Sequence, residues 1–315
     1  MDEPVISRLN AAIRRRKTLN TVTDAMRLVN SSGDGMPGLI LERYGNHFSA
    51  QIFHPKWLRQ KALLTAFIRD RLKGRFFIVK NRFRSGSADP DAFSTSFWIK
   101  EASSETTVRE NTLRFSVDLN DGLNCGLFLD MRKNRSLVAE KAKGLNVLNC
   151  FAYTCSFGVY ARNGGAARLV NVDISQKALE RGRINYSLNG IEPAEYEFIR
   201  ADAMNYMERA ARKGDRFDLI ILDPPSFARY RNRVFSVKKD LAHLVDRALC
   251  ALKHEGMLFV SSNFSSLTRK DLLTAVRFAA GKRAFKTIGR LGQDIDFPGS
   301  GRMPESHLAA LLIEL

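Results

Sequence analysis

The stretch NVLNCFAYTCSFGVYARNGGAARLVNVD (residues 146–173) decides the fold class of this sequence. Two short apolar runs, at 146–150 and 167–172, flank a segment long enough for a helix. The same alternation continues to the end of the chain, with further apolar runs at 196–200, 217–222, 256–262, 286–291 and 307–315. It predicts an α/β fold in which a mainly parallel sheet is covered by helices on both faces.

The last two expected strands are joined by a Gly/Pro-rich loop from Pro298 to Pro304. This loop has no room for the crossover of a dozen or more residues that a parallel pair needs. The sequence therefore predicts a Rossmann-like seven-stranded sheet whose last strand is antiparallel. Such a sheet differs from that of a dinucleotide dehydrogenase, in which all the strands are parallel.

The first 115 residues follow a different pattern. Residues 1–25 are expected to form a helix with a basic face, and residues 26–115 a small α+β domain. In that domain two strand-like runs, LILERYG and HFSAQIF, flank a Gly45-Asn46 turn, and residues 57–72 have helical spacing. Residues 116–315 are expected to form the α/β domain.

The charge of the chain points to a polyanionic partner. The 315 residues include 50 Lys and Arg against 33 Asp and Glu, a net charge of +17. This excess favours a nucleic acid over an anionic membrane surface, because no strongly amphipathic basic helix is evident. Basic residues cluster at 14–17 and 69–84. The second cluster includes Phe76, Phe77 and Phe83, which can either stack on bases or belong to the core.

Several classes of protein are disfavoured. No apolar run approaches the ~18–20 residues that span a bilayer, so no membrane partner is expected. The N-terminus lacks the apolar core of a signal peptide. Four cysteines without a CxxC pair argue against a disulfide scaffold or a zinc site, and no metal is expected. We expect a cytoplasmic protein, and the choice between monomer and homodimer stays open.

Polar residues gather where the expected strands end, which is where open α/β sheets bind ligands. The first strand ends in a small-residue turn at 149–158, whose N–H groups can face an anionic ligand. The turn lacks the GxGxxG spacing of a pyrophosphate site. Asp173 ends the second strand and can accept ribose hydroxyls, and Asp202 follows the third and can accept from an adenine amine. Taken singly, each acid is as often a helix cap or a turn residue.

The fourth strand is followed by Asp223-Pro224-Pro225-Ser226-Phe227. Two prolines fix φ and remove two N–H donors, so the loop is stiff. Its carbonyl groups and the Asp223 carboxylate can face a planar base, and Phe227 can supply a stacking surface. An enzyme that modifies a base has to hold it unstacked and rigid.

These motifs resemble a known family, the class I S-adenosylmethionine-dependent methyltransferases of bacterial 23S ribosomal RNA. The resemblance covers residues 20–315 and is greatest to a group that methylates cytosine C5 and to a group that methylates guanine N7. The stretches that carry it are Thr23–Val29, Gly33–Leu39, Asn124–Arg132, Leu148–Thr154, Val172-Asp173 and Leu222–Phe227.

The resemblance implies S-adenosylmethionine as cofactor, large-subunit rRNA as partner, and a small domain at 26–115 that helps to hold RNA. In this family pattern Asp173 takes the ribose and Asp202 the adenine. The implied cofactor-binding residues are Phe128, Asp130, Arg132, Asn149, Phe151, Ala152, Tyr153, Thr154, Asp173, Ile174, Asp202, Ala203 and Asp223. The implied catalytic residues are Asp223, Pro224, Pro225, Phe227 and Asn263. Candidates for contacts with the cofactor carboxylate or with phosphates are Arg132, Arg229 and Arg231.

Three features depart from the family pattern. The PUA domain of the family has no counterpart in this sequence, and Cys155 stands where the family usually has glycine. Where the cytosine-5 enzymes have Ser-Cys-Ser, this chain has Ser261-Ser262-Asn263. In this respect it is more similar to the guanine-N7 group.

The missing cysteine bears on the mechanism. Cytosine C5 is a poor nucleophile and needs a thiolate that adds to the ring, whereas guanine N7 has a lone pair and needs mainly positioning. We therefore expect an RNA base methyltransferase that acts on a purine nitrogen, with guanine N7 favoured. Two alternatives remain: a cytosine-5 enzyme that uses an unrecognised cysteine such as Cys155, and a non-catalytic RNA-binding or ribosome-assembly protein.

Overall fold

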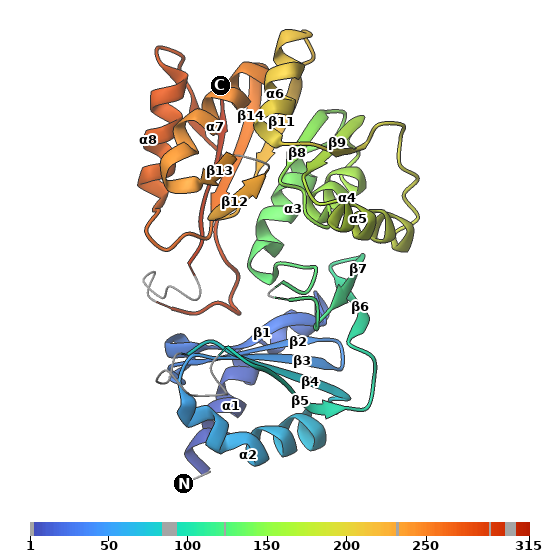
Figure 1. The fold of residues 1–315 in the computed structure, drawn as a ribbon, viewed down its shortest axis with the longest axis vertical. Coiled ribbons are helices and arrows are strands. Elements are labelled where there is room, and N and C mark those ends of the chain that lie inside the picture. The colour runs from blue at the N-terminus through green and yellow to red at the C-terminus, as the bar shows by residue number, and fades with distance from the viewer. Residues whose placement is uncertain (1–2, 84–92, 123, 231–232, 290, 300–306) are drawn as a thin grey trace. The chain divides into compact units, whose positions relative to one another are not determined.

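The computed structural model of the protein describes residues 3–83, 93–122, 124–230, 233–289, 291–299 and 307–315. The chain divides into two compact units, Met1–Leu129 with Asp294–Met303, and Asp130–Gln293 with Pro304–Leu315 (Figure 1). The N-terminal unit thus extends beyond residue 115, the limit expected from the sequence. It does so because residues 116–118 complete a strand of this unit, and the Gly122 carbonyl accepts a hydrogen bond from Lys80 Nζ there.

The N-terminal unit is built on a five-stranded sheet of order β1-β2-β3-β4-β5, with a separate β6-β7 hairpin. Its strands are β1 (Ala25–Asn30), β2 (Leu39–Tyr44), β3 (His47–Ile52), β4 (Phe76–Asn81), β5 (Thr95–Lys100), β6 (Glu105–Glu110) and β7 (Leu113–Asp118). Its helical segments are α1 (Glu3–Arg15), η1 (Lys17–Thr21), η2 (Ser31–Asp34), η3 (Pro55–Gln60), α2 (Lys61–Ala66) and η4 (Phe67–Arg71).

The expected hairpin at Gly45-Asn46 is confirmed. Strands β2 and β3 pair antiparallel up to Tyr44 and His47, and Gly45 has the positive φ of 64° that a tight turn requires. Strand β4 then pairs parallel to β3, because the helical residues of η3, α2 and η4 carry the chain back along the sheet. Helix α1 adds Leu9 and Ala12 to the core of this unit.

The structure corrects the interpretation of the two basic clusters. Phe76, Phe77 and Phe83 are buried, so they belong to the core and do not stack on bases. The Arg16 guanidinium is also buried and lies 2.6 Å from the Asp34 carboxylate. Arg15 contacts the same carboxylate at 2.9 Å. Part of the charge at 14–17 therefore serves the fold of this unit.

The C-terminal unit has a seven-stranded sheet of order β10-β9-β8-β11-β14-β16-β15. Its strands are β8 (Asn146–Cys150), β9 (Arg168–Asp173), β10 (Phe198–Arg200), β11 (Phe217–Leu222), β14 (Leu252–Ser262), β15 (Lys286–Thr287) and β16 (Ala309–Glu314). The first five of these strands are parallel, and β16 is antiparallel to both of its neighbours. The Rossmann-like sheet with an antiparallel last strand, expected from the sequence, is confirmed.

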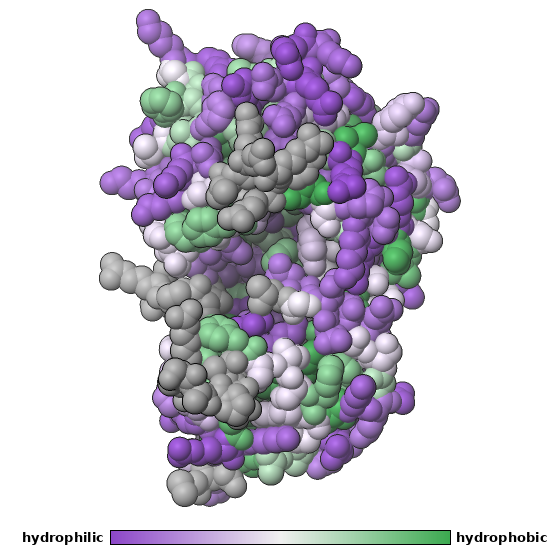
Figure 2. All heavy atoms as spheres, in the orientation of Figure 1, coloured by the Kyte–Doolittle hydropathy of each residue, from purple (hydrophilic) through white to green (hydrophobic). Residues whose placement is uncertain are grey.

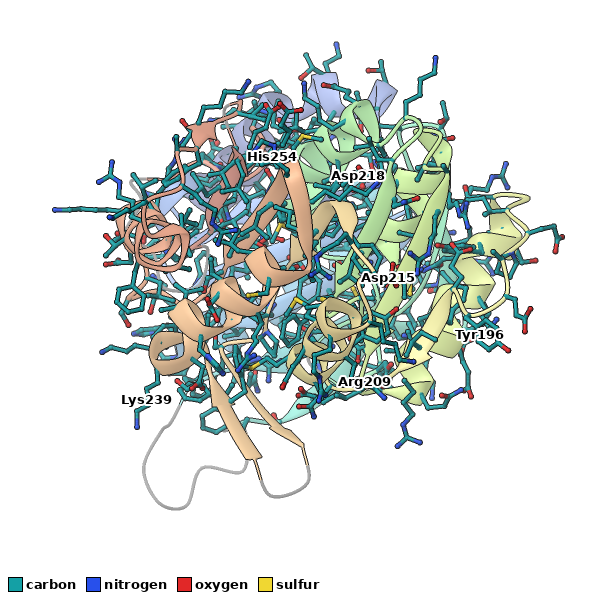
Figure 3. The ribbon with its side chains drawn as sticks, turned by 90° about the horizontal axis from the view of Figure 1, so that it is seen from above. Tyr196, Arg209, Asp215, Asp218, Lys239 and His254 are labelled. Atoms are coloured by element: carbon teal, nitrogen blue, oxygen red, sulfur yellow. The ribbon has the colours of Figure 1, made fainter. Side chains whose placement is uncertain are left out.

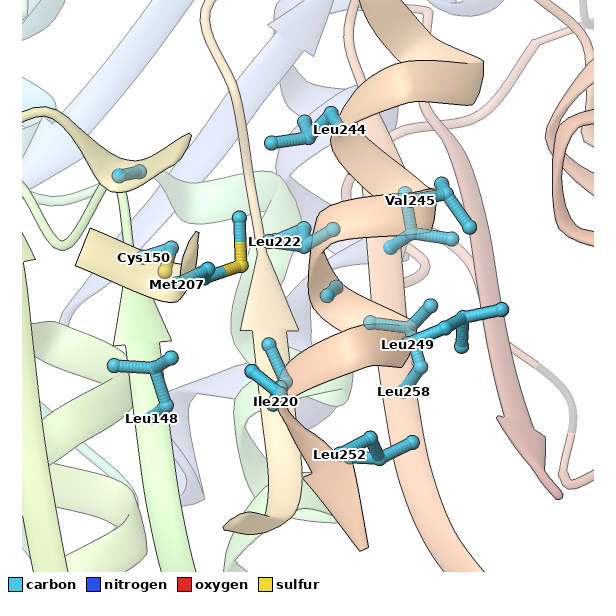
Figure 4. Packing of buried hydrophobic residues seen from close by; sticks show 14 of the residues in the cluster. Leu148, Cys150, Met207, Ile220, Leu222, Leu244, Val245, Leu249, Leu252 and Leu258 are labelled. Atoms are coloured by element: carbon cyan, nitrogen blue, oxygen red, sulfur yellow. The ribbon is translucent and has the colours of Figure 1, made fainter. Parts of the chain in front are cut away.

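Helices cover both faces of this sheet. They are α3 (Arg132–Lys141), α4 (Ser156–Asn163), α5 (Gln176–Leu188), α6 (Ala203–Arg212), α7 (Val237–Ala251) and α8 (Arg269–Ala280), and the short turn η5 (Leu129–Met131) precedes α3. Alternate strand residues such as Leu148, Ile220 and Leu258 pack with α6, α7 and α8 (Figure 4). The opposite face is covered by α3, α4 and α5, as the contact between Phe157 and Phe259 illustrates.

The face of the molecule drawn in Figure 2 is mostly polar. Hydrophilic side chains cover most of the face seen in Figure 2, and apolar side chains occur there in small groups. Among the helices of the described residues, none combines the length and the apolar character that crossing a membrane would take.

Candidate functional site

The register of the sheet brings the expected site residues of the C-terminal unit to one edge. Cys150 pairs with Val172 and with Leu222, which in turn pairs with Val260. The next residue in each strand, namely Phe151, Asp173, Asp223 and Ser261, therefore lies at the same level of the carboxyl edge. Asp202 also lies there, because Arg200, two residues before it, pairs with Asp173.

The loop after β8 has an unusual backbone. Phe151, Tyr153 and Cys155 all have positive φ, at 58°, 48° and 58°. A left-handed conformation costs a non-glycine residue roughly 1–2 kcal/mol, and such strain is typical of ligand sites. Hydrogen bonds hold the loop in place, because Ala152 N–H donates to the Val172 carbonyl at 3.1 Å. The loop thus presents its backbone in a fixed shape at the sheet edge.

Asp173 is tied to this loop. One carboxylate oxygen accepts the Tyr153 N–H at 2.8 Å, and the other accepts the Ser175 N–H at 2.8 Å. Burial raises the pKa of Asp173, while these two N–H groups and that of Ile174 act to lower it. The carboxylate has about four lone-pair sites, so at least one remains to accept a hydroxyl group of a ligand.

Asp202 caps helix α6. Its Oδ1 accepts the Asn205 N–H at 2.9 Å, and its backbone is extended, as at an N-cap. Asp202 is therefore a helix cap, which is one of the two roles that the sequence left open for it. It does not exclude binding, because Asp202 is only half-buried and its second oxygen can still accept a hydrogen bond.

Some expected cofactor residues lie inside the domain. Asn149 is 1% exposed, and its amide donates to Asn171 Oδ1 at 2.8 Å. Thr154 and Ala203 are also buried. The Asn149 side chain therefore does not reach the solvent at the carboxyl edge. Its hydrogen bond to Asn171 instead joins two strands beneath the loop.

Cys155 is fully buried, and its place is explained by a glycine on helix α5. A Cβ at Gly182 of α5 would lie 2.6 Å from Cys155 Sγ. The sulfur thus fills space that Gly182 leaves open. Burial also raises the pKa of the Cys155 thiol well above its usual range, so this thiol stays protonated at neutral pH.

Asp223 follows β11 and is half-buried, beside the buried Pro224 and the exposed Pro225. Its Oδ1 accepts a hydrogen bond from Ser261 Oγ at 2.6 Å. Burial raises the pKa of Asp223 to about 6, Asp130 adds to this increase, and Ser261 and Arg135 oppose it. A pKa this close to neutrality is typical of functional carboxylates.

Phe227 lies just after the Asp223-Pro224-Pro225 loop, and Asn263 lies just after β14. Ser226 Oγ donates to Asn263 Oδ1 at 3.1 Å, and Asn263 is exposed. The Phe227 ring is 64% exposed and meets the Phe264 ring edge-on at 6.0 Å. An exposed aromatic ring beside amide and carboxylate groups can receive a planar base.

Sequence reasoning missed a hairpin that begins at Phe227. Strands β12 (Phe227–Tyr230) and β13 (Arg233–Ser236) pair antiparallel, and Phe235 lies 5.8 Å from Phe151 between ring centroids. The alternation in FARYRNRVFS was an available signal. Ser261 was also missed as a partner of Asp223, although it lies in the run compared with Ser-Cys-Ser.

Phe128 and the arginines expected to contact the cofactor or phosphates do not gather at the carboxyl edge in the described part of the C-terminal unit. Phe128 is half-buried and belongs to the N-terminal unit, whereas the other expected cofactor residues belong to the C-terminal unit. Arg132 is the first residue of α3 and is 2% exposed, so its side chain lies in the interior of the protein. Arg231 and the side chain of Arg229 lie outside the described residues.

The opposite edge of the sheet is occupied by ion pairs. Asp215 contacts Arg168 at 2.6 Å, and Asp218 contacts Lys253 at 2.9 Å. Figure 3 labels Asp215, Asp218 and His254, which lie close to the amino ends of β11 and β14.

Comparisons with known proteins bear on the family of this chain. A family model described as S-adenosylmethionine-dependent methyltransferase matches residues 53–314. YwbD of Bacillus subtilis, a candidate ribosomal RNA large subunit methyltransferase, is 32% identical over 98% of this chain and 80% of its own length. Ribosomal RNA large subunit methyltransferase I of Aeromonas hydrophila is 32% identical over 91% of this chain and 74% of its own length.

A solved structure has the same fold. SMU.776, a candidate methyltransferase complexed with SAH, superposes with a TM-score of 0.89 at 27% identity. The match covers 100% of this chain and 82% of that chain.

Proposed function

The chain belongs to the family of S-adenosylmethionine-dependent methyltransferases, and from this premise we propose that it methylates a base of large-subunit ribosomal RNA, with guanine N7 as the acceptor. The observation that carries the proposal is the carboxyl edge of the sheet. There a strained loop, two carboxylates suited to a nucleoside, and the Asp223-Pro224-Pro225 loop lie together.

The residues at this edge fit S-adenosylmethionine. A ribose offers two hydroxyl donors and an adenine offers an amine, and Asp173 and Asp202 each keep at least one lone pair to accept from them. The backbone of the loop from Phe151 to Cys155 would lie along the methionine part. When bound, the cofactor supplies a methyl group on a positively charged sulfur, which becomes a neutral thioether when the methyl leaves. The protein's part is to hold the donor in place and to exclude water.

Guanine N7 is favoured by the chemistry of the cysteines. Cys125, Cys150 and Cys155 all have pKa values raised by burial, that of Cys125 to about 11. Cys250 precedes β14 and so lies toward the amino edge of the sheet. None of these four cysteines therefore combines an ionised thiol with a place at the carboxyl edge, as attack on a cytosine would require. N7 methylation needs none, because the nitrogen lone pair forms the new bond and no proton is removed.

The base would be held by three residues. The Asp223 carboxylate accepts N–H groups from the base edge, Asn263 offers an amide, and Phe227 stacks on the ring. The stiffness of Pro224 and Pro225 keeps Asp223 and Phe227 in place. No general base is required for N7, so the role of Asp223 is to orient the base.

RNA as the substrate agrees with the net charge of +17 and with the names of the relatives. Since part of the N-terminal basic cluster is paired internally, we propose a further phosphate-binding surface on α6. A hollow of about 410 Å³ is lined by Arg200, Ala201, Asp202, Asn205, Glu208, Arg209 and Arg212. Within the described part of the chain, Arg209 and Arg212 have no ion-pair partner, and both are exposed (Figure 3 labels Arg209). Guanidinium groups of this kind bind phosphates well.

The test is direct. The protein is incubated with methyl-labelled S-adenosylmethionine and unmodified large-subunit rRNA, and the nucleosides are identified by mass spectrometry. We expect 7-methylguanosine. Labelled 5-methylcytidine would support the cytosine-5 alternative, and a protein that binds RNA without transferring label would support the non-catalytic one.

A further inference from the structure

A buried hydroxyl group contacts the carboxylate that we assign to the base. Ser261 lies near the end of β14, is 0% exposed, and donates to Asp223 Oδ1 at 2.6 Å. Its Oγ also lies 3.3 Å from the Leu222 carbonyl. Strands β11 and β14 are neighbours in the sheet, so the contact joins the ends of two rigid elements. Asp223 therefore has one oxygen fixed by the sheet itself.

Apart from this hydrogen bond, few interactions stabilise the ionised form of Asp223. Burial disfavours it, and the Asp130 carboxylate of η5 repels it. Arg135 of α3 attracts it, and the Ser261 hydroxyl stabilises it by a hydrogen bond. A hydroxyl that donates to a carboxylate favours the ionised form, and such charge-assisted bonds are among the stronger ones in proteins.

We propose that Ser261 is a positioning residue, whose hydroxyl fixes one oxygen of Asp223 and keeps this carboxylate ionised at neutral pH so that its other oxygen can receive the base. The proposal rests on the proposed function in one respect, namely that Asp223 accepts N–H groups of the base. A protonated Asp223 would present a donor where an acceptor is needed.

The chain contains a matched control in the next residue. Ser262 is also 0% exposed, but its Oγ accepts the Phe264 N–H at 3.2 Å. Successive strand residues point to opposite faces of the sheet, so Ser261 and Ser262 differ in direction and not in chemistry. Alanine at either position deletes one buried hydroxyl from the same strand.

The first readout needs neither RNA nor cofactor. Carboxyl-labelled aspartate is titrated by NMR in the whole protein, and the Asp223 signal is assigned by its absence in Asp223→Asn. We expect a midpoint near pH 6 in the wild type. In Ser261→Ala it should move upward by about one pH unit, and in Ser262→Ala it should stay in place. An unchanged midpoint in Ser261→Ala, or an equal shift in both variants, would overturn the inference.

The second readout is the pH profile of single-turnover methyl transfer to rRNA at saturating cofactor. The acid limb should follow the Asp223 titration, so it should move upward in Ser261→Ala and recover in Ser261→Thr, which restores a hydroxyl. If the NMR midpoint moves and the acid limb does not, Ser261 still sets the charge of Asp223, and the assignment of Asp223 to the base is what fails. Thermal unfolding of each variant at pH 7.5 identifies any that does not fold.

Discussion

The sulfur of Cys155 fills the space that a side chain at Gly182 would need, since a Cβ there would lie 2.6 Å from Sγ. Cys155 holds a left-handed backbone, with φ of 58°, in the strained loop after β8. Cys155 in that loop and Gly182 in helix α5 thus constrain each other's side-chain size. This coupling explains how a cysteine can stand at a position where glycine would be the easier choice.

Replacing Gly182 by alanine should lower the free energy of unfolding by about 2 kcal/mol, because the new methyl group overpacks the sulfur. Adding Cys155→Gly should restore most of this loss, because it removes the sulfur, and helices prefer alanine to glycine. Urea denaturation of the wild type, both single variants and the double variant measures the coupling. Additive losses would show that the two side chains do not compete for the same space.

The raised pKa of Asp223 makes a prediction for stability. The folded-state pKa of about 6 lies above the unfolded value of ~3.9, so the folded protein binds more protons at intermediate pH. The cost of the buried charge is therefore absent below about pH 4 and complete above about pH 6. Asp223→Asn should be about 2 kcal/mol more stable than the wild type at pH 7.5 and equal to it at pH 4. Urea denaturation at both values checks this, and an equal gain at the two pH values would point to another cause.

Phe227 should matter for RNA and not for the cofactor. We expect Phe227→Ala to lower kcat/KM for rRNA by about 10–100-fold, since stacking of a base on an aromatic ring is worth ~1–3 kcal/mol. Affinity for S-adenosylmethionine, measured by calorimetry, should not change. Phe278 of α8 is 80% exposed and provides the control. A similar loss of activity in Phe278→Ala would show that Phe227 has no specific role in binding the base.

The α6 arginines should contribute to RNA affinity through phosphate contacts. In the double variant Arg209→Ala/Arg212→Ala, we expect the slope of log affinity against log salt to fall by about 0.7 for each lost contact. A control of equal charge is Arg269→Ala/Lys270→Ala at the start of α8, where both residues are exposed. Equal slopes for the two double variants would mean that binding responds to net charge alone.

The sheet could be predicted because its parallel strands are buried on both faces and appear as continuous apolar runs. The carboxyl edge followed from the strand ends, so Asp173, Asp202 and Asp223 could be named together. Their hydrogen bonds could not, because partners such as Ser261 are distant in sequence and are set by the strand register.

Other features needed the structure. The Arg16–Asp34 ion pair and the burial of Phe76 and Phe77 depend on tertiary packing, which turned an apparent base-stacking cluster into core. The hairpin that begins at Phe227 lacks the apolar run that identifies a buried strand, and only the alternation of its residues indicated it. Asn149, in turn, is the last residue but one of the buried strand β8, and its side chain is buried, where residue type alone suggested a ligand contact.

The most direct test of the cofactor site at the carboxyl edge is calorimetric titration of S-adenosylmethionine into Asp173→Asn and Asp215→Asn. Asp215 is paired with Arg168 at the opposite edge of the same sheet, so its variant controls for the loss of a carboxylate. We predict wild-type affinity for Asp215→Asn and a loss of at least about tenfold for Asp173→Asn, because charge-assisted hydrogen bonds to the ribose are removed. Unchanged affinity in a folded Asp173→Asn protein would contradict the assignment.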